Sequence, residues 1–302
     1  MGRGGAGRSH GTMTKLIEEK GLYRNYPPLS RIEWHLSKSR YFAYGMDHVV
    51  SRARFHWYNW RRKRKLIPAS LINYESKVFS QNGEDGILQE IFRRIGEGDK
   101  FSVEFGIGDG TECCTRNLLV NLAWAGLLIE GSPQCAGEAL SLYRQFDKVS
   151  VRQSSITAEN ILDLFRDNGV PQSPDLLVVD IDGNDYWILD RILSAYKPRV
   201  IICEYSARWT PKTDCVMPYD PDHVWDGSAY FGASLTSLFR LAEKHGYTLV
   251  CCESRGVNAF FVRTALIGTR FPDHHLGLGH YVPPHYGRGF GHALRFRYRR
   301  KV

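Results

Sequence analysis

The sequence has no apolar run long enough to cross a membrane, and its first residues lack the apolar stretch that a signal peptide needs. Its 7 cysteines include no CxxC pair and no other zinc-binding spacing. Internal repeats are also missing. These absences argue against a membrane protein, a zinc ribbon and a disulfide-stabilised secreted domain, so we expect a cytoplasmic protein with reduced thiols.

Basic residues are outnumbered in the middle of the chain and abundant at both ends. Residues 76–263 carry 18 Lys and Arg against 26 Asp and Glu, whereas residues 1–75 carry 15 against 5 and residues 264–302 carry 7 against 1. We therefore predict an acidic central domain between a basic, aromatic and partly disordered N-terminal arm and a basic tail rich in His and Arg. Both arms are expected to stay solvated or to contact a phosphate-rich surface.

The N-terminal arm combines aromatic side chains with a basic run over 61–65. Such a segment packs on its own domain, binds an anionic membrane surface or another protein, or stacks on the bases of nucleic acid. We favour packing, rank an anionic membrane surface second and nucleic acid last. The histidines of the tail lack the regular spacing of a metal site, and we expect the tail to be solvated.

From residue 83 onward, short apolar runs alternate with segments of helical periodicity. The expected strands cover 101–105, 126–130, 148–152, 175–181, 199–205, 247–252 and 257–263. The expected helices cover 83–95, 113–123, 134–145, 157–167, 184–195 and 233–245. Several strands are continuous apolar runs that need burial on both faces, so the predicted fold class is α/β, with a mostly parallel sheet between helices.

The last two expected strands are joined by very few residues, 254–256. No helix fits there, so these strands form an antiparallel C-terminal hairpin that closes a seven-stranded sheet. A long segment without regular period, 206–232, follows the fifth strand. It lies at the carboxyl edge of the sheet, where open α/β folds bind ligands, and we interpret it as a substrate lid.

A glycine-rich turn follows the first strand. Gly106, Gly108 and Gly110 alternate where the chain must turn tightly and approach a ligand. Glu130 ends the next strand, and a carboxylate there can accept hydrogen bonds from both hydroxyls of a ribose. Together these features predict a nucleoside cofactor in a Rossmann-like domain.

Two kinds of nucleoside cofactor could bind at this loop, a dinucleotide or S-adenosylmethionine. A dinucleotide needs GxGxxG spacing and a helix N-terminus against its phosphates, where Asp109 would place a negative charge. S-adenosylmethionine carries a sulfonium and an ammonium group, which nearby carboxylates stabilise. The closing hairpin is also typical of Rossmann-like methyltransferases and not of dinucleotide dehydrogenases. We therefore expect S-adenosylmethionine, in contact with Gln81, Glu104, Gly106, Gly108, Asp109, Gly110, Glu130, Ser155, Ile156 and Asp180.

Carboxylates also gather at the starts of two expected helices. Asp182 and Asp185 follow the fourth strand and can act as general bases or hold a divalent metal, while capping by Asp182 or Asn184 would involve no chemistry. Nothing in the spacing fixes a coordination number, so no metal ligand is assigned and a metal is not favoured. Before the first helix, Gln81, Glu84 and Asp85 either cap that helix or close over the cofactor.

Four blocks of the sequence resemble, in this order, the FkbM-like methyltransferases and the related Star-like domains. They are Ser80-Gln81-Asn82-Gly83-Glu84-Asp85, Val103-Glu104-Phe105-Gly106 with Asp109-Gly110, Trp124-Ala125-Gly126-Leu127-Leu128-Ile129-Glu130 and Val179-Asp180-Ile181-Asp182-Gly183. The resemblance covers most of 80–205. It implies S-adenosylmethionine as cofactor and O-methylation, often of sugars or natural products. The chain departs from the pattern at Cys113-Cys114-Thr115, where such domains often have Ser-Asn-Thr.

The sequence therefore predicts an S-adenosylmethionine-dependent methyltransferase that acts on a hydroxyl of a sugar or small natural product. The candidate catalytic residues, which would remove the hydroxyl proton, are Asp182, Asp185 and His223. The alternative is a non-catalytic binding protein on the same scaffold, with its basic arms on an anionic surface. Methylation of nucleic acid through the aromatic arm is a third and less favoured hypothesis.

Overall fold

The computed structural model describes residues 70–227 and 230–285. The N-terminal arm up to residue 69 and the tail from residue 286 lie outside the described residues, as do the predictions made for them. Within the described ranges, no helix is both long and apolar enough to cross a membrane.

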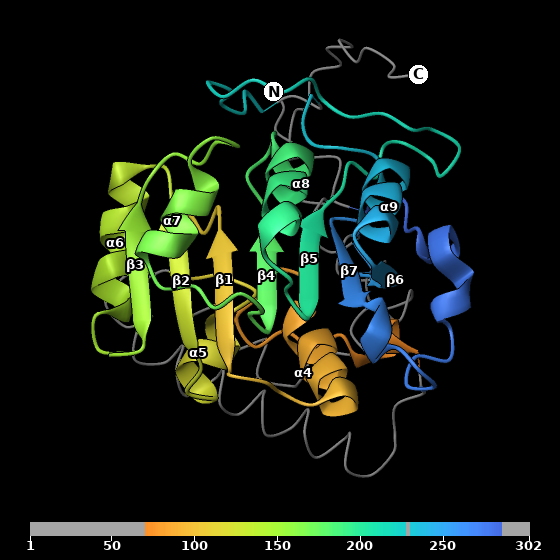
Figure 1. Cartoon of the computed structure of the whole chain (residues 1–302), viewed down its shortest axis with the longest axis horizontal. Helices are drawn as coiled ribbons and strands as arrows, with labels where there is room; N and C mark the ends of the chain where they lie inside the picture. Colours follow the sequence, from red (N-terminus) through yellow and green to blue (C-terminus); the bar gives the residue numbers. More distant parts are fainter. Residues whose placement is uncertain (1–69, 228–229, 286–302) are drawn as a thin grey trace, which may run out of the picture. The chain divides into compact units, whose positions relative to one another are not determined.

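A seven-stranded sheet forms the centre of the molecule, with strand order β3-β2-β1-β4-β5-β7-β6. The strands are β1 (Phe101–Phe105), β2 (Ala125–Glu130), β3 (Val149–Gln153), β4 (Leu176–Val179), β5 (Val200–Glu204), β6 (Tyr247–Cys252) and β7 (Asn258–Arg263). The first five are parallel, while β7 runs antiparallel to both β5 and β6. Figure 1 shows β7 pointing against β4 and β5. The predicted fold class, a mostly parallel sheet closed by an antiparallel hairpin, is confirmed.

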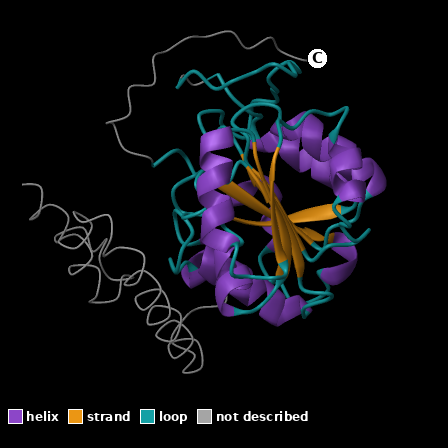
Figure 2. Ribbon diagram, turned by 90° about the vertical axis from the view of Figure 1, so that its left-hand side faces the viewer, coloured by secondary structure: helices purple, strands orange, loops and turns teal. Residues whose placement is uncertain are grey.

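Helices cover both faces of the sheet, as Figure 2 shows. They are α4 (Glu84–Ile95), α5 (Arg116–Asn121), α6 (Pro133–Tyr143), α7 (Ile161–Asp167), α8 (Asp185–Ala195) and α9 (Leu235–Lys244). Apolar side chains of α4, α5 and α6 join one buried cluster, and those of α7, α8 and α9 join another. Neighbouring residues of one strand enter different clusters: Ile201 faces the α8 side, whereas Ile202 faces the α4 side. This two-sided burial explains why the parallel strands are continuous apolar runs.

Two helices begin later than their periodicity predicts, because local hydrogen bonds occupy the preceding residues. Ahead of α5, the backbone N–H groups of Cys114 and Thr115 donate to the Glu104 carboxylate. Ahead of α7, the N–H of Thr157 donates to Oδ1 of Asn160, and the N–H of Asn160 donates to Oγ1 of Thr157. Side-chain acceptors thus replace the first helical turn at both places.

The packed body continues past residue 263. Short 3-10 helices form at Leu71–Tyr74, Thr264–Leu266 and His274–His280. Leu71 and Phe271 are fully buried beside the α4 layer, and the hydroxyl of Tyr281 donates to the carbonyl oxygen of Ala207. Residues 70–75 and 264–285 therefore contribute to the same core as the sheet, so the expectation of a solvated tail from residue 264 is wrong for 264–285.

Candidate active site

Polar residues gather at the carboxyl edge of the parallel strands, the edge at which open α/β folds bind ligands. Glu104 stands next to the end of β1, Glu130 ends β2, and Glu204 ends β5. Asp180 follows β4 directly. The topology thus places the predicted glycine loop, ribose carboxylate and acidic segment along one edge of the sheet.

The glycines of the loop serve different purposes. A Cβ on Gly106 would lie 1.5 Å from the carbonyl oxygen of Asp180, so the loops after β1 and β4 approach each other too closely for any side chain. Gly108 has a φ of 54°, and a Cβ there would meet no atom within 4 Å. The turn at Gly108 is therefore open on the side where a ligand can approach the backbone.

Glu130 is held in place by two backbone amides. Its Oε2 accepts from the N–H of Gly108 and its Oε1 from the N–H of Ser132, both at 2.8 Å. Each oxygen keeps a further lone pair, so the carboxylate can still accept two ribose hydroxyls. The loop after β3, which carries Ser155 and Ile156, lies alongside, because the N–H of Ser154 donates to the carbonyl oxygen of Glu130.

Glu104 and Asp109, two residues predicted to contact the cofactor, accept hydrogen bonds from the segment that follows β1. Glu104 is buried and accepts from the N–H and hydroxyl of Thr115 and from the N–H of Cys114. Burial raises the pKa of the Glu104 carboxyl to about 7, against the lowering effect of these hydrogen bonds. Asp109 is exposed and accepts from the N–H and hydroxyl of Thr111. Both carboxylates shape the segment that follows the glycine loop.

The carboxylates ahead of α4 also have structural partners. Asp85 is buried and accepts from the backbone N–H groups of Val78, Phe79 and Ser80, each at 2.8 Å. Burial raises the pKa of Asp85 to about 6. Glu84 accepts from the N–H of Asn82 and from the side-chain amide of Asn258. Gln81 is the exposed member of this group, and its Oε1 accepts from Nδ2 of Asn82 at 3.3 Å.

Asp185 organises the acidic turn after β4. Its Oδ1 accepts from the N–H of Ile181 at 2.8 Å, and its Oδ2 accepts from the N–H of Gly183 at 2.9 Å. Neither Asp182 nor Asn184 caps α8 with its side chain: Asn184 instead donates to the carbonyl oxygen of Asp220 at 2.7 Å. Asp182 sits between these residues with a φ of 54°.

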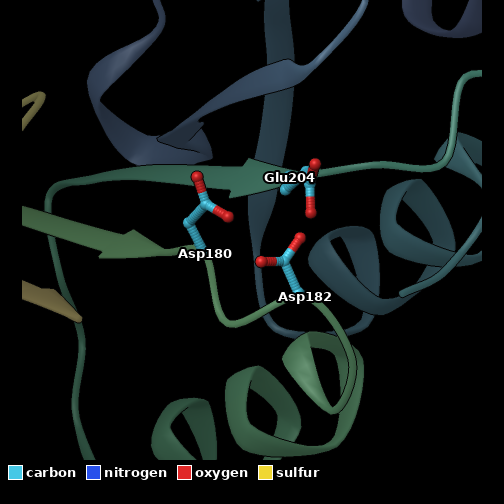
Figure 3. A group of neighbouring side chains, drawn as sticks. All are labelled: Asp180, Asp182 and Glu204. Atoms are coloured by element: carbon cyan, nitrogen blue, oxygen red, sulfur yellow. The ribbon is translucent and has the colours of Figure 1, made fainter. Parts of the chain in front are cut away.

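Asp180, Asp182 and Glu204 form a carboxylate cluster, shown in Figure 3. From each side chain one oxygen can be chosen so that the three atoms lie within 4.8 Å of one another. Asp180 and Glu204 meet because the parallel register pairs Val179 with Cys203, the residues immediately before them. The sequence prediction omitted Glu204; its position at the end of an apolar strand was the available signal, but its pairing with Asp180 depends on the strand order and register.

Burial and mutual repulsion disfavour negative charge in this cluster. Burial is the larger cause that raises the pKa values of Asp180 and Glu204 well above the usual range, and the neighbouring Asp182 and Asp185 add to it. The pKa of Asp182 rises to about 6, mainly through burial and then through Asp185, while His223 acts in the opposite direction. A positive charge is therefore favoured beside these residues.

The 206–232 segment folds over the acidic turn. A Cβ on Gly183 would lie 2.4 Å from Cδ2 of His223, so the imidazole ring packs directly on this glycine. Nε2 of His223 is shielded from solvent and has no hydrogen-bond partner among the described residues. Trp187 anchors the same segment by donating from Nε1 to the carbonyl oxygen of Met217 at 2.9 Å. The structure thus brings together the three candidate catalytic residues, His223, Asp182 and Asp185.

Several solved structures are similar to this chain, among them one named as a methyltransferase and two that hold S-adenosyl-L-methionine or SAH. The fibrillarin of Aeropyrum pernix, crystallised with natively bound S-adenosyl-L-methionine, is 12% identical over 56% of this chain and 68% of its own, with a TM-score of 0.39. The precorrin-6y C5,15-methyltransferase of Geobacter metallireducens is 16% identical over 58% and 84%, with a TM-score of 0.36. The N-terminal domain of EvdMO1 with bound SAH is 14% identical over 61% and 81%, with a TM-score of 0.38.

A comparison with curated proteins found no match. The family model of the methyltransferase FkbM domain matches residues 87–249, which is more than half of the chain and includes β1 to β5, Glu130 and the acidic turn. The chain belongs to the FkbM methyltransferase family, and its cofactor is S-adenosylmethionine.

Proposed function

We propose that this protein transfers a methyl group to a hydroxyl oxygen of a sugar or another small natural product. The observation that carries the proposal is the buried, unpartnered Nε2 of His223 beside the carboxylates of the acidic turn. A hydroxyl must lose its proton as its oxygen is methylated, and an imidazole nitrogen with no other partner is suited to accept that proton.

The residues at the carboxyl edge fit the cofactor. Glu130 would hold the ribose through its two remaining acceptor sites, and the open side of Gly108 admits a ligand against the backbone. Asp180 would lie near the cationic end of the cofactor, where negative charge is favourable. When bound, S-adenosylmethionine supplies the electrophilic methyl group.

The acidic turn supports the proposed base. Asp182 and Asp185 interact electrostatically with His223, which lowers the pKa of each carboxyl against the larger, raising effect of burial. Asp185 uses both oxygens on backbone amides, so its contribution is to hold the turn and to supply charge. The hydroxyl proton would therefore pass to Nε2 of His223, and Asp182 would stabilise the imidazolium that results.

The segment over the turn favours a small, hydroxylated acceptor. Asn184 and Trp187 tie it to the first turn of α8 at Asp220 and Met217. The hydroxyl of Tyr219 ties it to the loop after β3, because it accepts from the N–H of Ala158. A segment anchored at several points can orient an acceptor and exclude water, and free carboxylate oxygens beneath it can accept hydrogen bonds from sugar hydroxyls.

The test combines binding and turnover with the full-length protein. Calorimetric titration should show saturable binding of S-adenosylmethionine. Incubation with a panel of glycans and hydroxylated small molecules should give a product heavier by one CH2, about 14 Da, as expected when one hydroxyl is methylated. Cofactor binding without O-methylation of any hydroxylated acceptor would overturn the proposal. Methylation of a nitrogen or carbon atom instead would reject the hydroxyl specificity while leaving the family assignment intact.

A further inference from the structure

The carboxylate cluster of Asp180, Asp182 and Glu204 contains one residue, Glu204, to which the methyl-transfer proposal gives no role. Oε2 of Glu204 is shielded from solvent and accepts no hydrogen bond within the described ranges. An unpartnered, buried carboxylate oxygen is costly unless a donor or a cation occupies the space beside it. No described ion pair reaches Asp180, Asp182 or Glu204.

We propose that Asp180, Asp182 and Glu204 bind a single hard divalent cation of the magnesium type. All three ligands are carboxylate oxygens, which hard cations prefer. At metal–oxygen distances of about 2.1 Å, ligand oxygens around one octahedral ion lie about 3 to 4 Å apart. The oxygens of this cluster lie within 4.8 Å of one another, so small side-chain rotations bring them onto one ion.

The arrangement of neighbouring side chains separates these three ligands from Asp185. Asp185 directs both oxygens to the N–H groups of Ile181 and Gly183, and this leaves the turn shaped so that Asp182 faces Glu204. The three ligands come from the ends of two paired strands, β4 and β5, and from the turn after β4. Because these strand ends are rigid, the three ligand side chains stay close together before a cation binds.

The site leaves coordination positions for a further oxygen. Three protein ligands fill half of an octahedron, and water or an acceptor hydroxyl can take the remainder. A cation there would make a coordinated hydroxyl more acidic and place it beneath His223. This role in catalysis rests on the proposed O-methylation, whereas binding of the cation does not.

The test measures cation binding without cofactor or acceptor. Full-length protein stripped with EDTA is titrated with MgCl2 and MnCl2 by calorimetry, and bound Mn2+ is counted by electron paramagnetic resonance. We expect one ion per chain, with affinity at least about tenfold weaker in Glu204→Gln and in Asp182→Asn. The matched control is Glu243→Gln, because Glu243 is exposed at the end of α9, and it should bind as the wild type does.

Both variants reduce the repulsion in a crowded cluster, so folding should be retained, and circular dichroism checks this. Absence of binding to the wild type, or unchanged binding in both cluster variants, would overturn the inference. Methyl transfer that persists in EDTA would separate the two proposals, because the cation would then be dispensable while O-methylation stands. Cation binding without methylation of any acceptor would support the cation site while the O-methylation proposal fails.

Discussion

The carboxylate of Glu130 accepts a hydrogen bond from the backbone N–H of Gly108, at 2.8 Å. This bond joins the end of β2 to the turn that follows β1, although 22 residues separate the two in sequence. The second oxygen accepts from Ser132, so the carboxylate sets the shape of the turn while retaining acceptor capacity for a ribose. The same group thus shapes the cofactor site and takes part in it.

We predict that Glu130→Ala weakens binding of S-adenosylmethionine by about 10- to 100-fold, because hydrogen bonds to a charged group contribute about 1.5–3 kcal/mol. Calorimetric titration measures this change. Glu138→Ala is the control, since Glu138 is exposed on α6 and the same truncation there should leave affinity unchanged. Equal affinities in wild type and Glu130→Ala would refute the ribose assignment.

Much of this edge could be predicted from sequence, because parallel strands buried on both faces are continuous apolar runs. Leu176–Val179 is such a run, and the residues that follow it therefore had to lie at the carboxyl edge. Glu130 was predictable for the same reason. The pairing of Asp180 with Glu204 was not predicted, because it depends on which strand lies beside β4 and in which register.

Sequence also cannot distinguish a carboxylate that faces a ligand from one that faces its own backbone. Glu104 and Asp185 stand in polar segments beside the site, yet both direct their oxygens to backbone amides. Glu104 accepts from the segment ahead of α5, and Asp185 accepts from the acidic turn that precedes it. These contacts arise from turns whose dihedral angles depend on tertiary packing. The roles of such residues could be assigned only from the structure.

Stability should depend on pH through Glu104. Its pKa in the folded protein is about 7, above the ordinary 4.5, so the folded state binds more protons than the unfolded state between these values. The free energy of unfolding should therefore fall as pH rises from about 4.5 to about 7, by about 3 kcal/mol from this group. Urea unfolding at a series of pH values measures the slope.

Other buried carboxylates, such as Asp85, contribute with the same sign, so the contribution of Glu104 is isolated by comparison with a variant. Glu104→Gln has no titrating group at this position and should show a flatter dependence between pH 5 and 7. An identical slope in wild type and variant would show that Glu104 does not titrate in this range.

Gly183→Ala should reduce turnover, because the added Cβ would lie 2.4 Å from Cδ2 of His223 and would displace the imidazole. We expect a fall in kcat of about tenfold or more with little change in the affinity for S-adenosylmethionine. Gly137→Ala in α6 is the control, since its Cβ meets no atom within 4 Å. That substitution should stabilise the protein by about 0.5–1 kcal/mol and leave kcat unaltered.

Replacement of His223 decides whether the effect of Gly183→Ala acts through the imidazole. His223→Ala should lower kcat by about 100-fold or more if Nε2 accepts the hydroxyl proton, again with unchanged cofactor affinity. In that background the ring is gone, so adding Gly183→Ala should lower kcat no further, and the two effects should be strongly non-additive. Steady-state kinetics of the two single variants and the double variant test this. Additive losses would mean that Gly183 acts on the acidic turn itself, and a His223→Ala variant with wild-type kcat would remove His223 from the mechanism.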